Sequence, residues 1–176
     1  MELWDAYDDQ RKLIPGAGLV RGEPIPKGMN HLVIHAWYIN PAGELLIQQR
    51  AFDRPLAPGL WFCTGGSALQ GEDTTAACIR ETEEEMGFTP DMTKALLPIS
   101  FKRVDAFIDV YMIPADLPVS ALHLQKSEVA DAKWAAVDEI NRMLADGRFW
   151  HARYHEMLMQ FVHEQYGVEW RRGQWL

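Results

Sequence analysis

The chain has little cysteine, no long apolar run and no excess of basic residues, and each shortage excludes a class of protein. Two cysteines are too few for a disulfide framework, so we expect a reducing, cytoplasmic compartment. No apolar run approaches the roughly 20 residues that span a bilayer, and residues 1–5 lack the basic and apolar regions of a signal peptide. A net charge of −8 argues against a broad nucleic-acid-binding face. We therefore expect no membrane and no nucleic acid polymer among the partners.

The remaining composition predicts a single α/β domain. The chain has 176 residues, 48% of them apolar, and seven tryptophans, enough for a sizeable core. The domain is expected to fill 1–176, with a hairpin and extension at 1–28 and a C-terminal helix and tail at 149–176. Stretches rich in Gly and Pro at 16–28 and 51–59 are expected to be irregular. Apolar patterns predict strands at 4–6, 13–14, 31–40, 44–50, 61–64, 100–104, 107–113 and 132–135, and helices at 137–145 and 149–166.

The segment 66–88 carries the strongest functional signal. It opens with a glycine-rich turn and continues into a stretch with the marks of a complete helix. Asp73, Thr74 or Thr75 can cap the start of this helix through a side-chain oxygen. Gly87 can end it, because glycine tolerates the left-handed conformation found after many helices. We therefore predict a helix between these caps.

This helix gathers carboxylates on one side. At about 100° per residue, Glu81, Glu84 and Glu85 fall within an arc of about 100°. Like charges at this spacing weaken a helix, and a hard divalent cation such as Mg²⁺ or Mn²⁺ removes that cost. The alternative is a solvated acidic face. The side expected to pack carries Ala76, Ile79, Thr82 and Met86.

The spacing of the whole segment resembles the Nudix box. The matching positions are Gly66, Glu72, Arg80, Glu81, Glu84, Glu85, Gly87 and the apolar Phe88. One departure is Thr82, where the family usually has an aliphatic residue. The resemblance implies an α/β/α sandwich with a mixed sheet and a central box helix. It also implies hydrolysis of a diphosphate linked to another group, with Mg²⁺ as cofactor and Mn²⁺ as the alternative.

The resemblance also implies roles for individual residues. Glu81, Glu84, Glu85 and the Gly65 carbonyl are the expected metal ligands, and Glu81 and Glu84 are also the expected catalytic residues. Gly66, Glu72, Arg80 and Gly87 are expected to be structural parts of the box.

Three further residues are candidates outside the box. Glu128 is a candidate general base or further ligand, with a surface glutamate as the alternative. Arg50 and Arg54 follow a predicted strand where relatives place cations that contact phosphate, and the arginine fork suits that role. Solvated loop charges are the alternative for both.

Features around the box resemble isopentenyl diphosphate isomerase and its hydrolase-like relatives. The isomerase needs a cysteine seven residues before the Gly-Glu glutamate, where this chain has Gly65. Cys63 is two places early, a displacement of roughly 7 Å along a strand. One isomerase histidine matches His31, but the position seven residues earlier is Pro24. The scaffold therefore resembles the isomerase branch, while the chemistry resembles that of a hydrolase.

We expect a Mg²⁺-dependent Nudix hydrolase that cleaves a small phosphorylated metabolite, a nucleoside diphosphate linked to another group. An isoprenoid diphosphate isomerase and a non-catalytic nucleotide sensor are the alternatives. The histidines of the first long strand, His31 and His35, are expected to be hydrogen-bonded residues of a half-polar sheet face. Trp170, Trp175 and the apolar helix before them fit either homodimer contacts or a cap on the monomer core.

Overall fold

The computed structural model describes residues 2–169. Within this range the strands are β1 (Leu3–Tyr7), β2 (Leu13–Val20), β3 (His31–Ile39), β4 (Leu45–Arg50), β5 (Trp61–Phe62), β6 (Thr64–Ser67), β7 (Leu96–Arg103), β8 (Ala106–Pro114) and β9 (Val129–Ala135). The helices are α1 (Thr74–Met86), α2 (Val137–Ala145) and α3 (His155–Tyr166), with short 3-10 turns η1 (Met92–Lys94) and η2 (Val119–Ala121). None of the helices in this range is long and apolar enough to cross a membrane.

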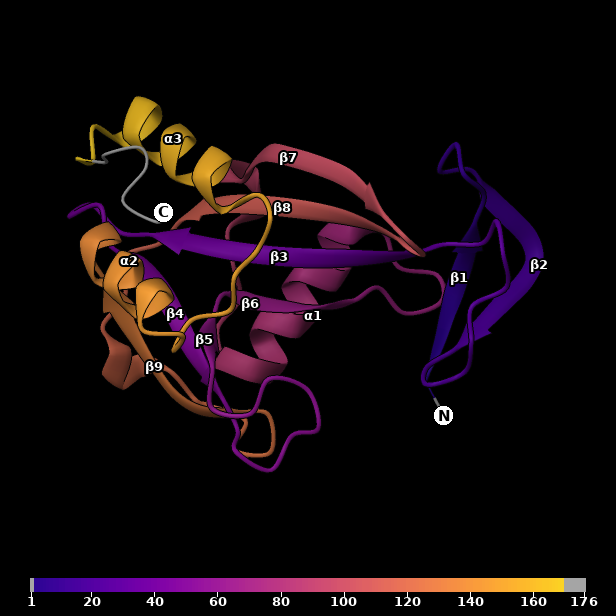
Figure 1. Cartoon of the computed structure of the whole chain (residues 1–176), viewed down its shortest axis with the longest axis horizontal. Coiled ribbons are helices and arrows are strands. Elements are labelled where there is room, and N and C mark those ends of the chain that lie inside the picture. The colour runs from indigo at the N-terminus through magenta and orange to yellow at the C-terminus, as the bar shows by residue number, and fades with distance from the viewer. Residues whose placement is uncertain (1, 170–176) are drawn as a thin grey trace.

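The main sheet is mixed, as the resemblance implied. Its strands run in the order β5-β4-β3-β8-β7, with β6 paired to β3 and β9 paired to β4. The long strands β3 and β8 are parallel, whereas the other pairs are antiparallel. The N-terminal strands β1 and β2 form a separate hairpin at one end of the molecule (Figure 1).

Helices cover both faces of this sheet, which gives the α/β/α arrangement (Figure 1). Alternate residues of β3 point to opposite faces. Ile34 and Tyr38 pack in one cluster with Met86 of α1. Trp37 packs in the other cluster with residues of α2 and α3, among them Leu158. The box helix therefore lies on one face, and the two later helices lie on the other.

Most predicted elements are confirmed, and the differences have local causes. Strand β2 extends to Val20, inside the stretch expected to be irregular, because Val20 and Leu19 pair with β1. The single strand expected at 61–64 is two strands, since β5 pairs with β4 and β6 pairs with β3.

The C-terminal helix begins at His155, so the prediction of a helix from residue 149 is wrong. Phe149 forms a bridge with Trp61, and the Trp150 amide donates to the Trp61 carbonyl at 2.9 Å. These contacts hold the chain extended before α3. Trp170 and Trp175 lie outside the described residues.

The caps of the box helix are those predicted. The Asp73 side chain accepts a hydrogen bond from the Ala76 amide at 2.8 Å. Gly87 ends the helix at φ 76° and donates to two carbonyls of its last turn. Its position is also crowded, because an added Cβ would lie 2.9 Å from the His123 backbone nitrogen. Glycine is therefore required at this position for two reasons.

The packing face of α1 is rotated from the predicted one. Ala76 is exposed and Ile79 only half-buried, so the prediction that they pack is wrong for Ala76. The buried residues are Thr74, Ala77, Cys78, Thr82, Glu85 and Met86. Thr82 is fully buried, and its hydroxyl bonds to the Tyr38 hydroxyl and donates to the Cys78 carbonyl. The departure at Thr82 is thus matched by a polar partner on β3.

Candidate active site

The glycine turn brings bare backbone against the box helix. Strand β6 pairs with β3, and Gly65 lies opposite His35. A Cβ added at Gly66 would lie 2.1 Å from the Glu81 Oε1 atom. At Gly65 it would lie 3.0 Å from the His35 ring and from the Ile34 carbonyl. Gly66 therefore leaves the space that the Glu81 carboxylate occupies, and a side chain at Gly65 would be crowded by β3.

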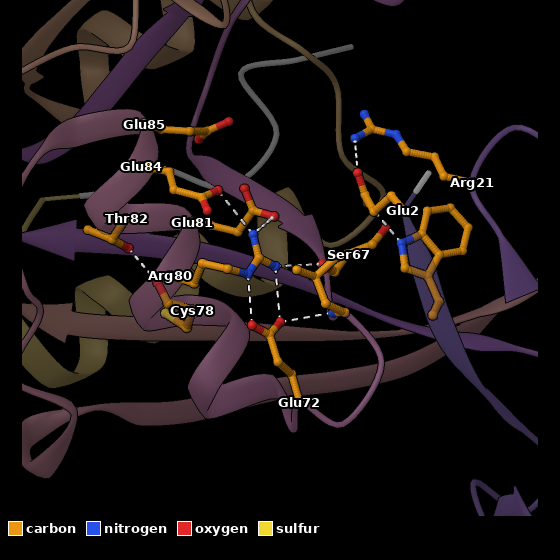
Figure 2. A network of polar contacts seen from close by, with 12 residues as sticks. Glu2, Arg21, Ser67, Glu72, Cys78, Arg80, Glu81, Thr82, Glu84 and Glu85 are labelled. Carbon is orange, nitrogen blue, oxygen red and sulfur yellow. Dashed lines mark hydrogen bonds and ion pairs between the residues drawn. The ribbon is translucent and has the colours of Figure 1, made fainter. Parts of the chain in front are cut away.

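Arg80 joins the glycine turn to the helix. Its guanidinium donates to both Glu72 oxygens, at 2.8 and 3.1 Å, and to the Ser67 carbonyl at 2.9 Å. The same group donates to Glu81 at 2.9 Å and to Glu84 at 3.1 Å. Figure 2 shows Arg80 between Glu72 on one side and Glu81 and Glu84 on the other. Arg80 therefore supplies the local positive charge for three carboxylates.

Glu72 is held as an anion at the end of this network. It accepts a hydrogen bond from the Leu69 amide at 2.9 Å, in addition to those from Arg80. Partial burial acts to raise the pKa of Glu72, but these hydrogen bonds outweigh it and lower the pKa. The arrangement is that of a charged residue that fixes a loop.

The two inner carboxylates are costly to ionise. Burial raises the pKa of Glu81 to about 7, although Arg80 opposes the shift. Burial also raises the pKa of Glu85 to about 8, against a hydrogen bond from the Gln48 amide at 2.7 Å. Glu84 differs, because half of its side chain is exposed. The alternative of a solvated acidic face therefore does not hold for Glu85, which is only 5% exposed.

A cavity of about 300 Å³ lies over these groups, and we call it the box cavity. Its walls include all three candidate ligand carboxylates, the glycine turn, Arg50 and Glu128, which come from four separate stretches of sequence. Among the described residues, no three acidic, histidine or cysteine side chains converge closely enough to form a metal site as they stand. In this arrangement Arg80 bonds to both Glu81 and Glu84.

Glu128 lies between Arg50 and Arg54, the two other candidate residues outside the box. Arg54 contacts one carboxylate oxygen at 2.9 Å, and Arg50 contacts the other at 3.6 Å. Arg50 lines the box cavity, whereas Arg54 does not. The structure thus places Arg50 and Glu128 at the cavity and Arg54 behind Glu128.

The N-terminal hairpin contributes two cavity residues that the sequence analysis did not assign. Arg21 and Glu2 form an ion pair at 2.6 Å, and both line the box cavity. Their only sequence signal is charge close to a predicted hairpin, which fixes no position relative to the box. Gln125, which also lines the cavity, gives no signal of its own.

The cysteine and histidines near the site are packed groups. Cys63 is buried, and burial raises the pKa of its thiol well above the ordinary value. His35 bonds through Nδ1 to the Tyr154 hydroxyl at 2.7 Å, and burial lowers the pKa of His35 to about 4. His31 stacks on Trp4 at 4.2 Å between ring centroids. The expected side-chain hydrogen bond is present for His35, whereas His31 Nδ1 has no hydrogen-bond partner among residues 2–169.

Comparison with known proteins identifies the family. A family model for the NUDIX domain matches residues 29–158. The chain belongs to the Nudix family. An uncharacterised Nudix hydrolase of Listeria monocytogenes is 38% identical over 150 residues, which cover 85% of this chain and 88% of that protein. An isopentenyl-diphosphate Delta-isomerase of Citrobacter koseri is 28% identical over 121 residues, 65% of this chain and 67% of that protein.

Solved structures show the same fold. The DR0079 protein of Deinococcus radiodurans superposes with a TM-score of 0.73 at 20% identity, over 90% of this chain and 98% of that one. The NUDIX domain of Shewanella oneidensis NrtR, complexed with ADP ribose, gives a TM-score of 0.51 at 20% identity, over 77% of this chain and 88% of that one. The Nudix assignment and the branch resemblance to the isomerase are therefore both supported, with hydrolases the more similar relatives.

Proposed function

We propose that this Nudix protein hydrolyses a diphosphate linkage in a small phosphorylated metabolite, a nucleoside diphosphate joined to another group, with Mg²⁺ as cofactor and Mn²⁺ as the alternative. One observation carries the proposal: three box carboxylates, the glycine turn and an arginine share the walls of a single cavity. We also propose that the whole chain is one domain and that the protein is cytoplasmic.

The donor set suits a hard divalent cation. Oxygen is the preferred donor for Mg²⁺, and the candidate ligands are the carboxylates of Glu81, Glu84 and Glu85 with the Gly65 carbonyl. Burial raises the pKa of both Glu81 and Glu85. A nearby cation would stabilise their ionised forms and lower these pKa values. Bound there, Mg²⁺ would neutralise diphosphate oxygens and lower the pKa of a water.

The residues of the chain supply positioning and charge. Arg80 fixes the Glu72 loop to the helix, so the glycine turn is held beside the ligands. Arg50 borders the cavity and can contact the diphosphate through its fork, at the expense of its long contact to Glu128. Glu128 would then accept a proton from the attacking water, or serve as a further ligand. Arg54 holds Glu128 in place.

The alternative of an isomerase is less well supported. A catalytic cysteine must reach substrate, whereas Cys63 is 2% exposed and its thiol is kept neutral by burial. In the isomerase a metal-binding histidine follows the cysteine by two residues, and these two positions hold Gly65 and Ser67 in this chain. A nucleotide sensor without turnover is the second alternative, and the intact set of box carboxylates argues against it. We further propose that the protein can form a homodimer.

The test is turnover by the purified protein with Mg²⁺ on ADP-ribose, dinucleotides, nucleoside triphosphates, coenzyme A and isopentenyl diphosphate, read by chromatography. Glu84→Gln should abolish turnover while leaving the fold intact. Glu83→Gln is the matched control, since Glu83 lies on the same helix, is exposed, and within the described part of the chain its side chain bonds only to Thr89. Normal turnover in a folded Glu84→Gln protein would refute the ligand assignment. Isomerised isopentenyl diphosphate would favour the isomerase. Tight binding of a nucleotide without turnover would favour the sensor.

A further inference from the structure

The box cavity is the first of three adjoining cavities. Beside it lies a middle cavity of about 280 Å³, and beyond that an outer cavity of about 620 Å³. The box and middle cavities share Arg50, Gly65, Gly66 and Ser67. The middle and outer cavities share His35, Arg103 and Trp150. The three cavities therefore adjoin one another along the surface between the box and β7.

Apart from Arg50 and Arg103, which it shares with the neighbouring cavities, the middle cavity is lined by uncharged groups. Its walls include the apolar side chains Leu56, Leu60, Phe62 and Trp150. His35 also lines it, but burial and then the charge of Arg103 lower the pKa of His35, so the ring is neutral near pH 7. Aromatic rings such as Phe62 and Trp150 favour contact with a flat ring or an apolar chain. This cavity suits the part of a substrate between two charged ends.

The outer cavity is positive. Its walls carry Lys102, Arg103, His151 and Arg153 and no Asp or Glu. Lys102 is paired with Asp9 at 2.6 Å, so it adds little net charge. Arg103 and Arg153 have no ion pair or side-chain hydrogen bond to any residue within 2–169. Two unpaired arginines facing one hollow are notable in a chain with a net charge of −8, where acidic partners are abundant.

Helix α3 adds to this potential. It begins at His155 beside the outer cavity, and no side chain among the described residues caps its first turn. The first amides of a helix carry partial positive charge and attract anions. Glu156 is exposed in the same turn and does not line the cavity.

The two charged ends of the system are well separated. Strand β6 carries the glycine turn and β7 carries Arg103, and β3 and β8 lie between them. Three strand spacings of about 4.8 Å give a separation of about 14 Å across the sheet. This separation is between strand backbones. Arg103 also lines the middle cavity together with Gly65 and Gly66, whereas Arg153 lines only the outer one of the three cavities. A diphosphate held at the box carboxylates therefore falls short of Arg153.

We propose that the substrate carries a second phosphate, a phosphate monoester remote from the diphosphate, and that Arg103 and Arg153 bind it. This inference rests on the proposed function, since it takes the diphosphate to lie at the box. A phosphate monoester carries close to two negative charges at pH 7 and matches two unpaired arginines. The aromatic or apolar part of the substrate occupies the middle cavity between its charged ends. The outer cavity thereby selects phosphorylated substrates over their dephosphorylated counterparts.

The test compares substrates that differ only in that phosphate: coenzyme A with 3′-dephospho-coenzyme A, NADPH with NADH, and ADP-ribose with its 2′-phosphate. The wild-type protein should prefer the phosphorylated member of at least one pair about tenfold or more in kcat/KM, through KM. Arg103→Gln and Arg153→Gln should each reduce this preference about tenfold, as expected for one charge-assisted contact. Arg142→Gln, at an exposed cation of α2 outside all three cavities, should keep the wild-type preference.

Calorimetric binding of the same pairs to Glu84→Gln separates this inference from the proposed function. Selective binding of a phosphorylated member without turnover by the wild-type protein would refute the hydrolase and support the outer cavity. Turnover without preference in any pair would overturn the cavity assignment and leave the hydrolase standing. A preference for the phosphorylated member that survives both arginine substitutions would also overturn the cavity assignment. Circular dichroism confirms that each variant is folded, which is expected because both arginines are exposed.

Discussion

Replacing Glu85 by Gln should stabilise the metal-free protein, and more so as pH rises. Glu85 is buried beside Gln48, and burial raises its pKa from 4.5 to about 8. For an acid whose pKa is higher in the folded state, the folded protein binds the proton more tightly than the unfolded chain. The contribution of Glu85 to the unfolding free energy is therefore greatest below about pH 4.5 and falls as pH rises towards about 8. Glutamine resembles the protonated acid at every pH and escapes this loss.

The magnitude follows from the two pKa values. One pKa unit corresponds to about 1.4 kcal/mol, so ionisation of Glu85 costs up to about 4 kcal/mol of unfolding free energy at about pH 8. At about pH 5 the same calculation gives about 1 kcal/mol or less. The advantage of Glu85→Gln should therefore grow by about 3 kcal/mol between these conditions. Glu81 is present in both proteins, so its own titration largely cancels from the comparison.

Urea unfolding with EDTA at about pH 5 and about pH 8 measures this difference. Glu83→Gln serves as the control, because Glu83 is exposed on the same helix. The reasoning is refuted if the difference in unfolding free energy between Glu85→Gln and wild type is the same at both pH values. Adding Mg²⁺ should reverse the order at about pH 8, because only the wild-type carboxylate gains from the cation.

Two further substitutions probe the site and the hairpin. Gly66→Ala should reduce Mg²⁺-dependent turnover about 10- to 100-fold, because the added Cβ would lie 2.1 Å from Glu81 and displace its carboxylate. Gly18→Ala is the control, because its added Cβ meets only ordinary contacts. Equal turnover by the two variants would contradict this geometry. Arg11→Met should lower the unfolding free energy by about 3 kcal/mol, because it leaves the Asp109 carboxylate, whose side chain is 2% exposed, without a cation and with only the hydrogen bonds from Ser100 and Thr74. Urea unfolding of Arg11→Met with and without Asp109→Asn checks this, and the double variant should recover much of the loss.

Local signals in the sequence predicted the elements well. The caps Asp73 and Gly87 act within one or two turns of α1, so their spacing alone determined where this helix starts and ends. Strands β3 and β8 were predicted from continuous apolar runs, which buried strands require. The error at residue 149 arose where a contact overrides periodicity: the bridge to Trp61 joins segments far apart in the sequence.

The site was predictable as a set of residues but not as an arrangement. The box motif gives the identity of the carboxylates, and a helical wheel gives their spread around α1. Neither reveals which carboxylate is buried, because that depends on Gln48 of β4, 37 residues earlier in the chain. Arg21 of the hairpin and Arg103 of β7 reach the cavities only through the packing of separate strands. Sequence periodicity describes one element at a time and cannot place such residues together.

The same burial that makes the box carboxylates costly to ionise should link cation binding to folding stability. Burial makes Glu81 and Glu85 costly to ionise. Among the described residues, Arg80 is the cation that bonds directly to the box carboxylates, and it already bonds to Glu72 and Glu84. Ionisation of the two inner carboxylates therefore opposes folding near neutral pH. A ligand that binds only the folded, ionised form returns that free energy and releases protons as it binds. Metal affinity in this protein should thus rise with pH between about 6 and 8, the range in which the pKa values of Glu81 and Glu85 lie.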